Sequence, residues 1–184
     1  MLYTRKGDDG TTKTFACDQK ISKSSAIAEA LGTLDETNSF LGLCKVKSKK
    51  EKLVIPNGTP AHETIHDIQK NLFIVQAEIA GSKMSITEDK VKEVEKIVDD
   101  IEKELPPIKS FFISGGTKLA ALFDTARTIE RRAERRVVQV YEERDVEVGE
   151  FTKAYLNRLS SLLYALARLS NYKSGIDEEG PDYK

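Results

Sequence analysis

The chain has 184 residues, 39% of them hydrophobic, which is enough to bury one sizeable core and suits a single domain. Its 29 lysines and arginines balance 30 acidic residues, so the formal charge of -1 excludes a global field that attracts nucleic acid or an anionic membrane. The N-terminus is charged and no run of about eighteen apolar residues occurs, so neither secretion nor a membrane span is expected. The two cysteines, Cys17 and Cys44, are too few for a disulfide framework and favour a cytoplasmic protein.

The N-terminal part of the chain is predicted to be irregular and then helical. The stretch from Thr4 to Phe15 is rich in glycine, threonine and charge without a lasting period, which indicates an irregular or short extended segment. From Ser24 the apolar spacing alternates between four and three residues, which predicts an amphipathic helix ending near Lys47. Its stripe consists of Ile27, Leu31, Leu34, Asn38 and Leu41.

Two further helices are predicted in the middle of the chain. After a loop over residues 47–60, a second helix has the stripe Ile65, Ile68, Leu72, Val75 and Ile79. Gly81 can supply the left-handed residue that closes this helix. The third helix begins at Thr87, whose side chain can cap the exposed amides, and Pro106 and Pro107 end it. Its stripe is Val91, Val94, Val98, Ile101 and Leu105.

The C-terminal part adds two more helices and a polar tail. The fourth has the stripe Leu119, Phe123, Ala126, Ile129 or Glu130, Ala133, Val137 and Val140. Gly149 separates it from the fifth, whose stripe is Tyr155, Leu159, Leu162, Leu166 and Leu169. Five helices and no convincing strand predict an all-α fold, a five-helix antiparallel bundle.

Three segments could carry chemistry. In the segment from Tyr3 to Lys13, glycine amides, threonine hydroxyls and basic side chains could hold a polyphosphate, although the spacing is not that of a P-loop. Arg127, Arg131 and Glu134 share one face of the fourth helix and could clamp a triphosphate. Asn157 offers donors and an acceptor for an adenine edge or a ribose. The alternatives are a solvated terminus, a salt-bridged helix face and an ordinary amide at the rim of the core.

A zinc-protease motif also occurs in the chain. His62, Glu63 and His66 form H-E-x-x-H, in which two histidines one turn apart can bind zinc while the glutamate acts as a base. These are the only histidines in the chain, so a third ligand would have to be a carboxylate that the sequence does not single out. Two exposed histidines after Pro60 are the favoured interpretation, and no metal ligand is predicted.

Four stretches together resemble the propanediol-utilisation-type cobalamin adenosyltransferases, the family of the human mitochondrial enzyme. They are Tyr3–Thr12, Gly32–Ser39, Gly115–Val138 and Leu156–Ser160. The resemblance implies a ferritin-like bundle that transfers the 5′-deoxyadenosyl group of ATP to cob(I)alamin. It implies one domain over residues 1–184, with an ATP-binding segment (1–22), a helical bundle (23–172) and a polar tail (173–184). It also implies a homotrimer with ATP between subunits, and Mg²⁺ bound through the ATP phosphates.

The resemblance also assigns roles to individual residues. The residues expected around ATP are Thr4, Arg5, Lys6, Gly7, Thr12, Lys13, Lys23, Arg131, Arg132, Glu134, Arg135 and Asn157. Asp35 and Arg127 are expected to form an ion pair between subunits, and Phe111 is expected against the lower face of the corrin ring. The family often has proline at Ser114, histidine at Asp124 and aspartate at Ser161, so the chain departs from it there.

Further partners and two rival functions complete the expectations. A cobalt reductase or a B12-dependent acceptor enzyme could interact with the chain, whereas nucleic acid and membranes are not expected. The first rival is a zinc hydrolase that uses His62, Glu63 and His66. The second is a non-catalytic, ATP-sensing helical bundle.

Overall fold

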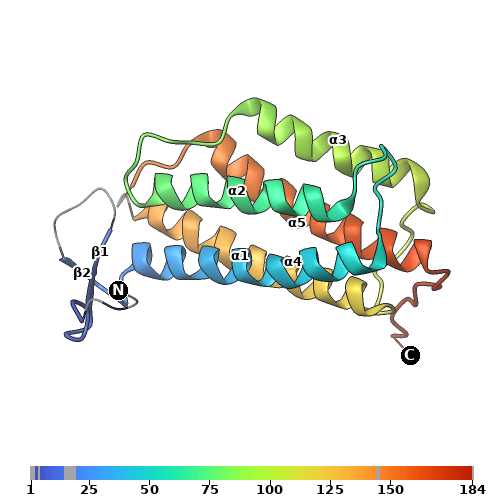
Figure 1. Ribbon diagram of the computed structural model, residues 1–184, viewed down its shortest axis with the longest axis horizontal. Coiled ribbons are helices and arrows are strands. Elements are labelled where there is room, and N and C mark those ends of the chain that lie inside the picture. Colours follow the sequence, from blue (N-terminus) through green and yellow to red (C-terminus); the bar gives the residue numbers. More distant parts are fainter. Residues whose placement is uncertain (1–2, 4, 15–19, 144–145, 184) are drawn as a thin grey trace.

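The computed structural model describes residues 3, 5–14, 20–143 and 146–183 (Figure 1). A short hairpin of β1 (Thr11–Lys13) and β2 (Lys20–Ser22) precedes the bundle. The bundle consists of α1 (Ala26–Glu51), α2 (Ala61–Ile79), α3 (Glu88–Glu104), α4 (Lys118–Glu142) and α5 (Glu150–Lys173). None of the helices within these ranges is long and apolar enough to cross a membrane. The predicted all-α bundle is confirmed.

Successive helices alternate in direction along the chain (Figure 1). α4 packs against α5 and α1, and α1 also packs against α2. α3 covers α5 and runs parallel to it. Contacts between the two helices and their flanking residues show this direction, because Ile86 bonds Thr152, Glu95 pairs with Arg158, and Glu104 pairs with Lys173.

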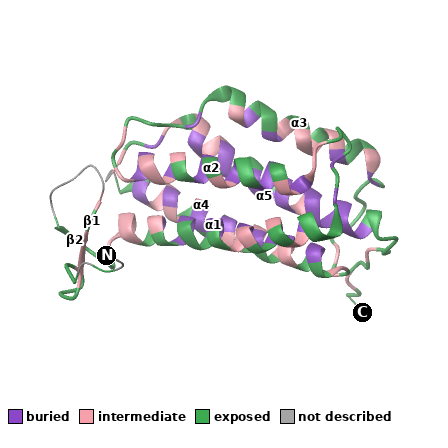
Figure 2. Cartoon of the chain, in the orientation of Figure 1, coloured by how far each residue is buried: buried purple, intermediate pink, exposed green. Residues whose placement is uncertain are grey.

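The core follows the predicted stripes closely. Buried residues face one another between the helices in Figure 2, and every stripe residue of α2 and α5 is buried. In α1, however, Ile27 and Leu31 are only half-buried, and Ala30, Thr33 and Thr37 occupy the core instead. α1 is packed by both α2 and α4, so its buried face is wider than the predicted stripe.

The helix ends confirm some predicted caps and contradict others. Gly81 has a φ of 91° after α2, as expected for a left-handed closing residue. Thr87 precedes α3, but its side chain makes no capping hydrogen bond, so that prediction is wrong. α1 continues past Lys47 to Glu51, where the two side chains form an ion pair 2.6 Å apart. The additional turn thus has a local stabilising contact.

A carboxylate from α2 caps α5. Glu78 is buried and accepts hydrogen bonds from the backbone N–H of Gly149, at 2.8 Å, and from the hydroxyl of Thr152. A negative charge at a helix N-terminus is stabilised by the unpaired amides and the helix dipole. Glu78 therefore fixes where α5 begins relative to α2.

The hairpin corrects the expectation that the chain contains no strand. β1 and β2 are antiparallel, and Thr12 lies opposite Ile21. Each strand has only three residues, with no lasting apolar alternation, so the sequence carries almost no strand signal. In Figure 1 the hairpin projects beyond the end of the bundle at which α1 begins.

Glu130 fills the α4 stripe position that the sequence left open between Ile129 and Glu130. It is fully buried, while Ile129 is half-buried. Neither carboxyl oxygen has a hydrogen-bond partner among the described residues. Burial, with a smaller contribution from Glu134, raises the pKa of Glu130 to about 9. The carboxyl group is therefore protonated and neutral at neutral pH.

Candidate functional site

A basic hollow lies in the N-terminal segment, at one end of the molecule. It has a volume of about 830 Å³, within the range of small-molecule sites. It is lined by Arg5, Lys6, Gly7, Asp8, Asp9, Thr11, Thr12, Lys13, Lys20 and Lys23, and we call it the N-terminal hollow. Five of these side chains are basic and two are acidic, so the lining has a net charge of +3. Such a lining suits a polyphosphate.

The backbone of this hollow is held by Gly7 and Lys23. The ammonium group of Lys23 donates to the carbonyl of Gly7 at 2.7 Å, and the backbone N–H of Lys23 donates to the carbonyl of Gly10 at 2.9 Å. A Cβ at position 7 would lie 3.0 Å from the carbonyl oxygen of Thr11, so the close approach favours glycine. Arg5 has a φ of 56°, a conformation that is uncommon for a side-chain-bearing residue.

Asp9 organises the rim of the hollow, a role that sequence reasoning missed. Its carboxylate bonds the ammonium group of Lys20 at 2.7 Å and accepts from the backbone and hydroxyl of Thr11 at 3.0 and 2.6 Å. The hydrogen bond from Lys20 and then those from Thr11 lower the pKa of Asp9. The carboxylate is thus charged at neutral pH and links the hollow to the hairpin.

One chain brings only part of the predicted ATP site together. Arg5, Lys6, Gly7, Thr12, Lys13 and Lys23 all line the N-terminal hollow, whereas Thr4 lies outside the described residues. No residue of α4 or α5 lines it. The predicted basic residues of α4 are therefore not part of the same hollow in a single chain.

The α4 row consists of Arg127, Arg131, Arg132, Glu134 and Arg135, which lie within about two and a half turns of one helix. Arg132 forms an ion pair with Glu36 of α1. This contact fits the alternative of a salt-bridged helix face that the sequence left open. The amide of Asn157 in α5 donates to Glu134 at 3.2 Å, so these two predicted residues do meet. Arg131 and Arg135 are exposed and have no hydrogen-bond or ion-pair partner within the described part of the chain.

Within the α4 row, Arg127 has a buried polar atom without a hydrogen bond to any described residue. Its Nε is buried and has no hydrogen-bond partner among the described residues. Its guanidinium lies 5.9 Å from the centre of the Tyr164 ring. Asp35, the expected partner, is exposed on α1 and does not pair with it within the chain.

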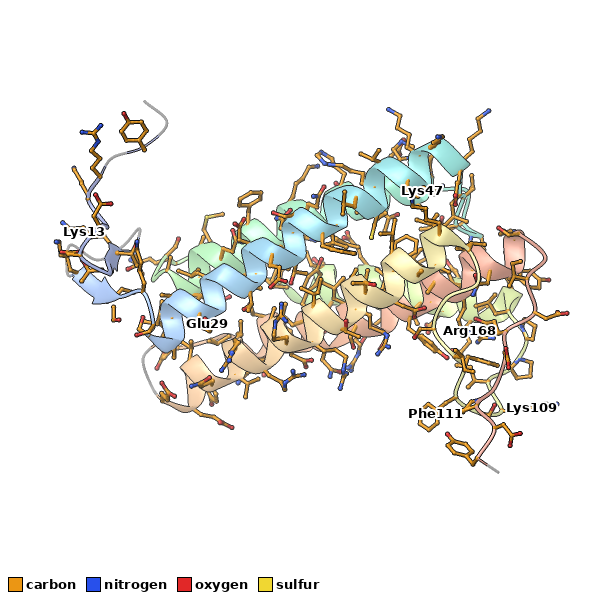
Figure 3. All side chains as sticks on the ribbon, turned by 90° about the horizontal axis from the view of Figure 1, so that it is seen from below. Lys13, Glu29, Lys47, Lys109, Phe111 and Arg168 are labelled. Atoms are coloured by element: carbon orange, nitrogen blue, oxygen red, sulfur yellow. The ribbon has the colours of Figure 1, made fainter. Side chains whose placement is uncertain are left out.

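Phe111 lies at the opposite end of the bundle from the N-terminal hollow, as the labels of Lys13 and Phe111 in Figure 3 show. Its side chain is 81% exposed. It belongs to the loop of residues 106–117 between α3 and α4. An aromatic ring this exposed is available to an apolar partner, but a single chain does not bring it near the hollow.

Side chains of α4 and α5 fix the end of the 106–117 loop. The backbone N–H of Gly115 donates to Asp124 at 3.1 Å. Asn171 donates to the carbonyl of Gly115 and accepts from the backbone N–H of Thr117, both at 2.9 Å. Gly116 has a φ of 92°, and a Cβ there would lie 2.5 Å from Asn171. Asp124, where the chain departs from the family pattern, thus has a structural role that the sequence did not reveal.

The two histidines do not form a metal site in the structure. His62, Glu63 and His66 line a groove between α1 and α2 together with Lys45, Val46, Lys49 and Asp67. Among the described residues, no group of three or more His, Cys, Asp or Glu side chains could hold a metal ion. Lysines in the groove also disfavour a cation. The described residues therefore provide no ligand set for the zinc-hydrolase alternative.

Comparison with known proteins identifies the family. Residues 2–170 match the family described as cobalamin adenosyltransferase. The chain belongs to this family. It is 37% identical to the corrinoid adenosyltransferase of Bacillus subtilis over 188 residues, covering 96% of this chain and 90% of that protein. It is 33% identical to human corrinoid adenosyltransferase MMAB, covering 97% of this chain and 72% of that protein.

Other relatives of this cobalamin adenosyltransferase family member are longer. The chain is 36% identical to corrinoid adenosyltransferase PduO of Citrobacter freundii, with 93% of this chain matched, but it spans only 50% of that protein. Among solved structures, a variant PduO-type ATP:corrinoid adenosyltransferase from Lactobacillus reuteri complexed with cobalamin and ATP superposes with a TM-score of 0.87. It is 28% identical, and the match covers 100% of this chain and 97% of that chain.

Proposed function

We propose that this transferase moves the 5′-deoxyadenosyl group of ATP to cob(I)alamin and forms adenosylcobalamin. The observation that carries the proposal is the basic N-terminal hollow, found at the start of a chain whose relative from Lactobacillus reuteri was solved with cobalamin and ATP. The family match and the likeness to the corrinoid adenosyltransferase of Bacillus subtilis support the same reaction.

The chemistry requires alignment and charge neutralisation. An electron pair on cobalt(I) attacks the C5′ atom of ATP, a cobalt–carbon bond forms, and the C5′–oxygen bond breaks to release triphosphate. Cobalt is the nucleophile, so no side chain needs to be one. The protein has to place the two substrates and stabilise the charge that builds on the departing triphosphate. Five basic side chains around the N-terminal hollow suit the second task.

Magnesium would be brought by the nucleotide. Among the described residues, no group of three or more His, Cys, Asp or Glu side chains could hold a metal ion. In the hollow, the carboxylate of Asp9 already accepts hydrogen bonds from Lys20 and Thr11. Mg²⁺ is commonly bound through substrate phosphates and retained waters instead of an all-protein cage. We therefore assign no residue of this chain as a magnesium ligand.

The complete site is proposed to form between two copies of the chain in a homotrimer. The N-terminal hollow, the α4 row and Phe111 do not share a pocket within one chain, and Figure 3 places Lys13 and Phe111 at opposite ends. A second copy can supply the missing part. Arg127 is only half-buried and forms no ion pair within the described residues, which supports a contact of its guanidinium with a group from outside the chain. Asp35 of a neighbouring copy, exposed on α1, is the proposed partner.

The remaining residue roles follow the same proposal. Thr4, Arg5, Lys6, Gly7, Thr12, Lys13 and Lys23 of one copy would face Arg131, Arg132, Glu134, Arg135 and Asn157 of another across ATP. Phe111 would contact the lower face of the corrin and exclude a lower axial ligand. A cobalt reductase or a B12-dependent acceptor enzyme, and a cytoplasmic location, stay predictions.

The test is a direct assay of product formation. The protein is incubated with ATP, magnesium and chemically reduced cobalamin, and the absorption spectrum is followed for adenosylcobalamin. The proposal expects product in proportion to the amount of protein. If folded protein binds ATP but forms no product, the non-catalytic ATP sensor is the better description.

A further inference from the structure

The C-terminal tail lies against the 106–117 loop, the loop that carries Phe111. The backbone N–H of Ile113 donates to the carbonyl of Glu179 at 2.8 Å. A Cβ on Gly180 would lie 3.3 Å from the hydroxyl of Ser110 and 3.6 Å from the carbonyl oxygen of Phe111, so the two segments are in close contact. In Figure 3, Arg168, Phe111 and Lys109 lie together at this end of the molecule.

Arg168 of α5 connects the tail with this loop. Its Nε donates to the carboxylate of Glu178 in the tail at 2.8 Å, and Nη2 donates to the carbonyl of Pro106 at 3.1 Å. Its guanidinium also lies 5.0 Å from the centre of the Phe112 ring. One side chain thus holds the tail, the start of the loop and the residue next to Phe111.

The ion pair between Arg168 and Glu178 differs from the surface pairs of the bundle. The two side chains are only 6% and 16% exposed, whereas those of Arg158 and Glu95 are 44% and 42% exposed. Exposed pairs contribute little, but removing one partner of a buried pair leaves an uncompensated charge. Without Glu178, the guanidinium of Arg168 would be expected to turn toward solvent and release Pro106 and Phe112.

We propose that Arg168 is a positioning residue for the corrinoid site and that Glu178 of the tail keeps it in place. The pair holds the 106–117 loop so that Phe111 is presented in a fixed orientation before the corrinoid arrives. This inference rests on the proposed function. Arg168 and Glu178 would contact neither substrate. They act through the C-terminal tail, which already packs against the loop in the chain without ligand.

Preorganisation is the physical reason for the effect. The ring of Phe111 is 81% exposed, so contacts of its own side chain do little to fix it. Its orientation depends on the backbone of the loop. A loop that must become ordered when the corrinoid binds loses affinity, because the ordering entropy opposes binding. ATP is proposed to contact the N-terminal hollow and the α4 row and not the 106–117 loop, so the KM for ATP should not change with the order of this loop.

The test compares Glu178→Ala with Glu179→Ala. Glu179 is the matched control, because its side chain is exposed and only its backbone carbonyl contacts the loop. The measurements are the KM for cob(I)alamin, the KM for ATP, kcat, and hydrogen exchange of the amides in residues 108–113. For Glu178→Ala we expect the corrinoid KM to rise about tenfold and the loop amides to exchange faster, with the KM for ATP within about twofold. Glu179→Ala should match the wild type.

A second variant, Arg168→Lys, keeps the charge next to Glu178 but loses the planar group that reaches Pro106 and Phe112. It should raise the corrinoid KM as well, and thermal unfolding identifies any loss of fold. Equal increases in both KM values would overturn the proposal, because a general structural defect explains them. Faster loop exchange with an unchanged corrinoid KM would also overturn it.

Failure of the proposed function gives a different result from failure of the positioning proposal. In that case the wild-type protein itself makes no adenosylcobalamin, and the hydrogen-exchange comparison of Glu178→Ala with Glu179→Ala still reports on the contact between tail and loop. Accelerated exchange in Glu178→Ala alone then supports the positioning of the loop, and equal exchange in both variants overturns it.

Discussion

Glu130 shows how a single residue can set the pH response of the fold. It lies on α4 and is fully buried in the core. Because burial raises its pKa from 4.5 to about 9, the folded chain keeps a proton that the unfolded chain releases across this window. The contribution of Glu130 to stability therefore falls as pH rises from about 4.5 toward 9, by about 1.4 kcal/mol for each pH unit.

Replacing Glu130 by glutamine should remove this pH dependence. The variant Glu130→Gln cannot ionise, so its free energy of unfolding should exceed that of the wild type by an amount that grows by about 2 to 3 kcal/mol between pH 6 and 8. Urea unfolding at both pH values measures the difference. The exposed Glu102→Gln on α3 is the control and should show a constant difference. A constant difference for Glu130→Gln too would mean that Glu130 is ionised in the folded chain.

At the scale of elements, the sequence predicts what local periodicity can carry. The stripes of α2 and α5 place every one of their apolar residues in the core, and proline or glycine marks several helix ends correctly. The hairpin is missed because three-residue strands leave no pattern. Asp9, Asp124 and Arg168 are also missed. Their roles depend on partners elsewhere in the fold, and spacing along one helix cannot reveal such partners.

Part of the candidate site could also be predicted from the sequence, and part of it could not. The sequence indicates the composition of the N-terminal hollow, because glycine, threonine and basic residues are adjacent in the chain. The row of charges on α4 is likewise readable from its spacing. What spacing leaves open is which of these charges are already paired within the chain. Arg132 is paired with Glu36, whereas Arg131 on the same helix has no ion-pair partner among the described residues.

This difference makes Arg131 the residue to test on α4. Arg131→Ala should weaken ATP binding by about 1.5 to 3 kcal/mol, because it removes charge-assisted hydrogen bonds to phosphate. Arg136→Ala, on the same helix and 3.7 Å from Glu29, is the matched control outside the predicted site. Titration calorimetry with ATP measures both affinities. Unchanged affinity in Arg131→Ala, or equal losses in the two variants, would argue against a phosphate contact by Arg131.

At the scale of the whole molecule, the separation of functional parts is the main feature. The N-terminal hollow lies at one end of the bundle and Phe111 is exposed at the other end. The α4 row belongs to a helix of the bundle between them, and its Arg131, Arg132 and Arg135 are exposed. A single chain presents these parts but does not assemble them. The proposed site is therefore a property of neighbouring copies, each of which contributes a different part.

Mixing two variants tests this central claim directly. Lys23→Ala damages the hollow and Arg131→Ala damages the α4 row, so each variant alone should have low adenosyltransferase activity. In assemblies formed from equal amounts of both, about a quarter of the sites between copies should combine an intact hollow with an intact row by chance pairing. The account predicts recovery toward about a quarter of wild-type activity. If assemblies verified to contain both variants have only the mean activity of the two, the hollow and the row act within one chain and the account is contradicted.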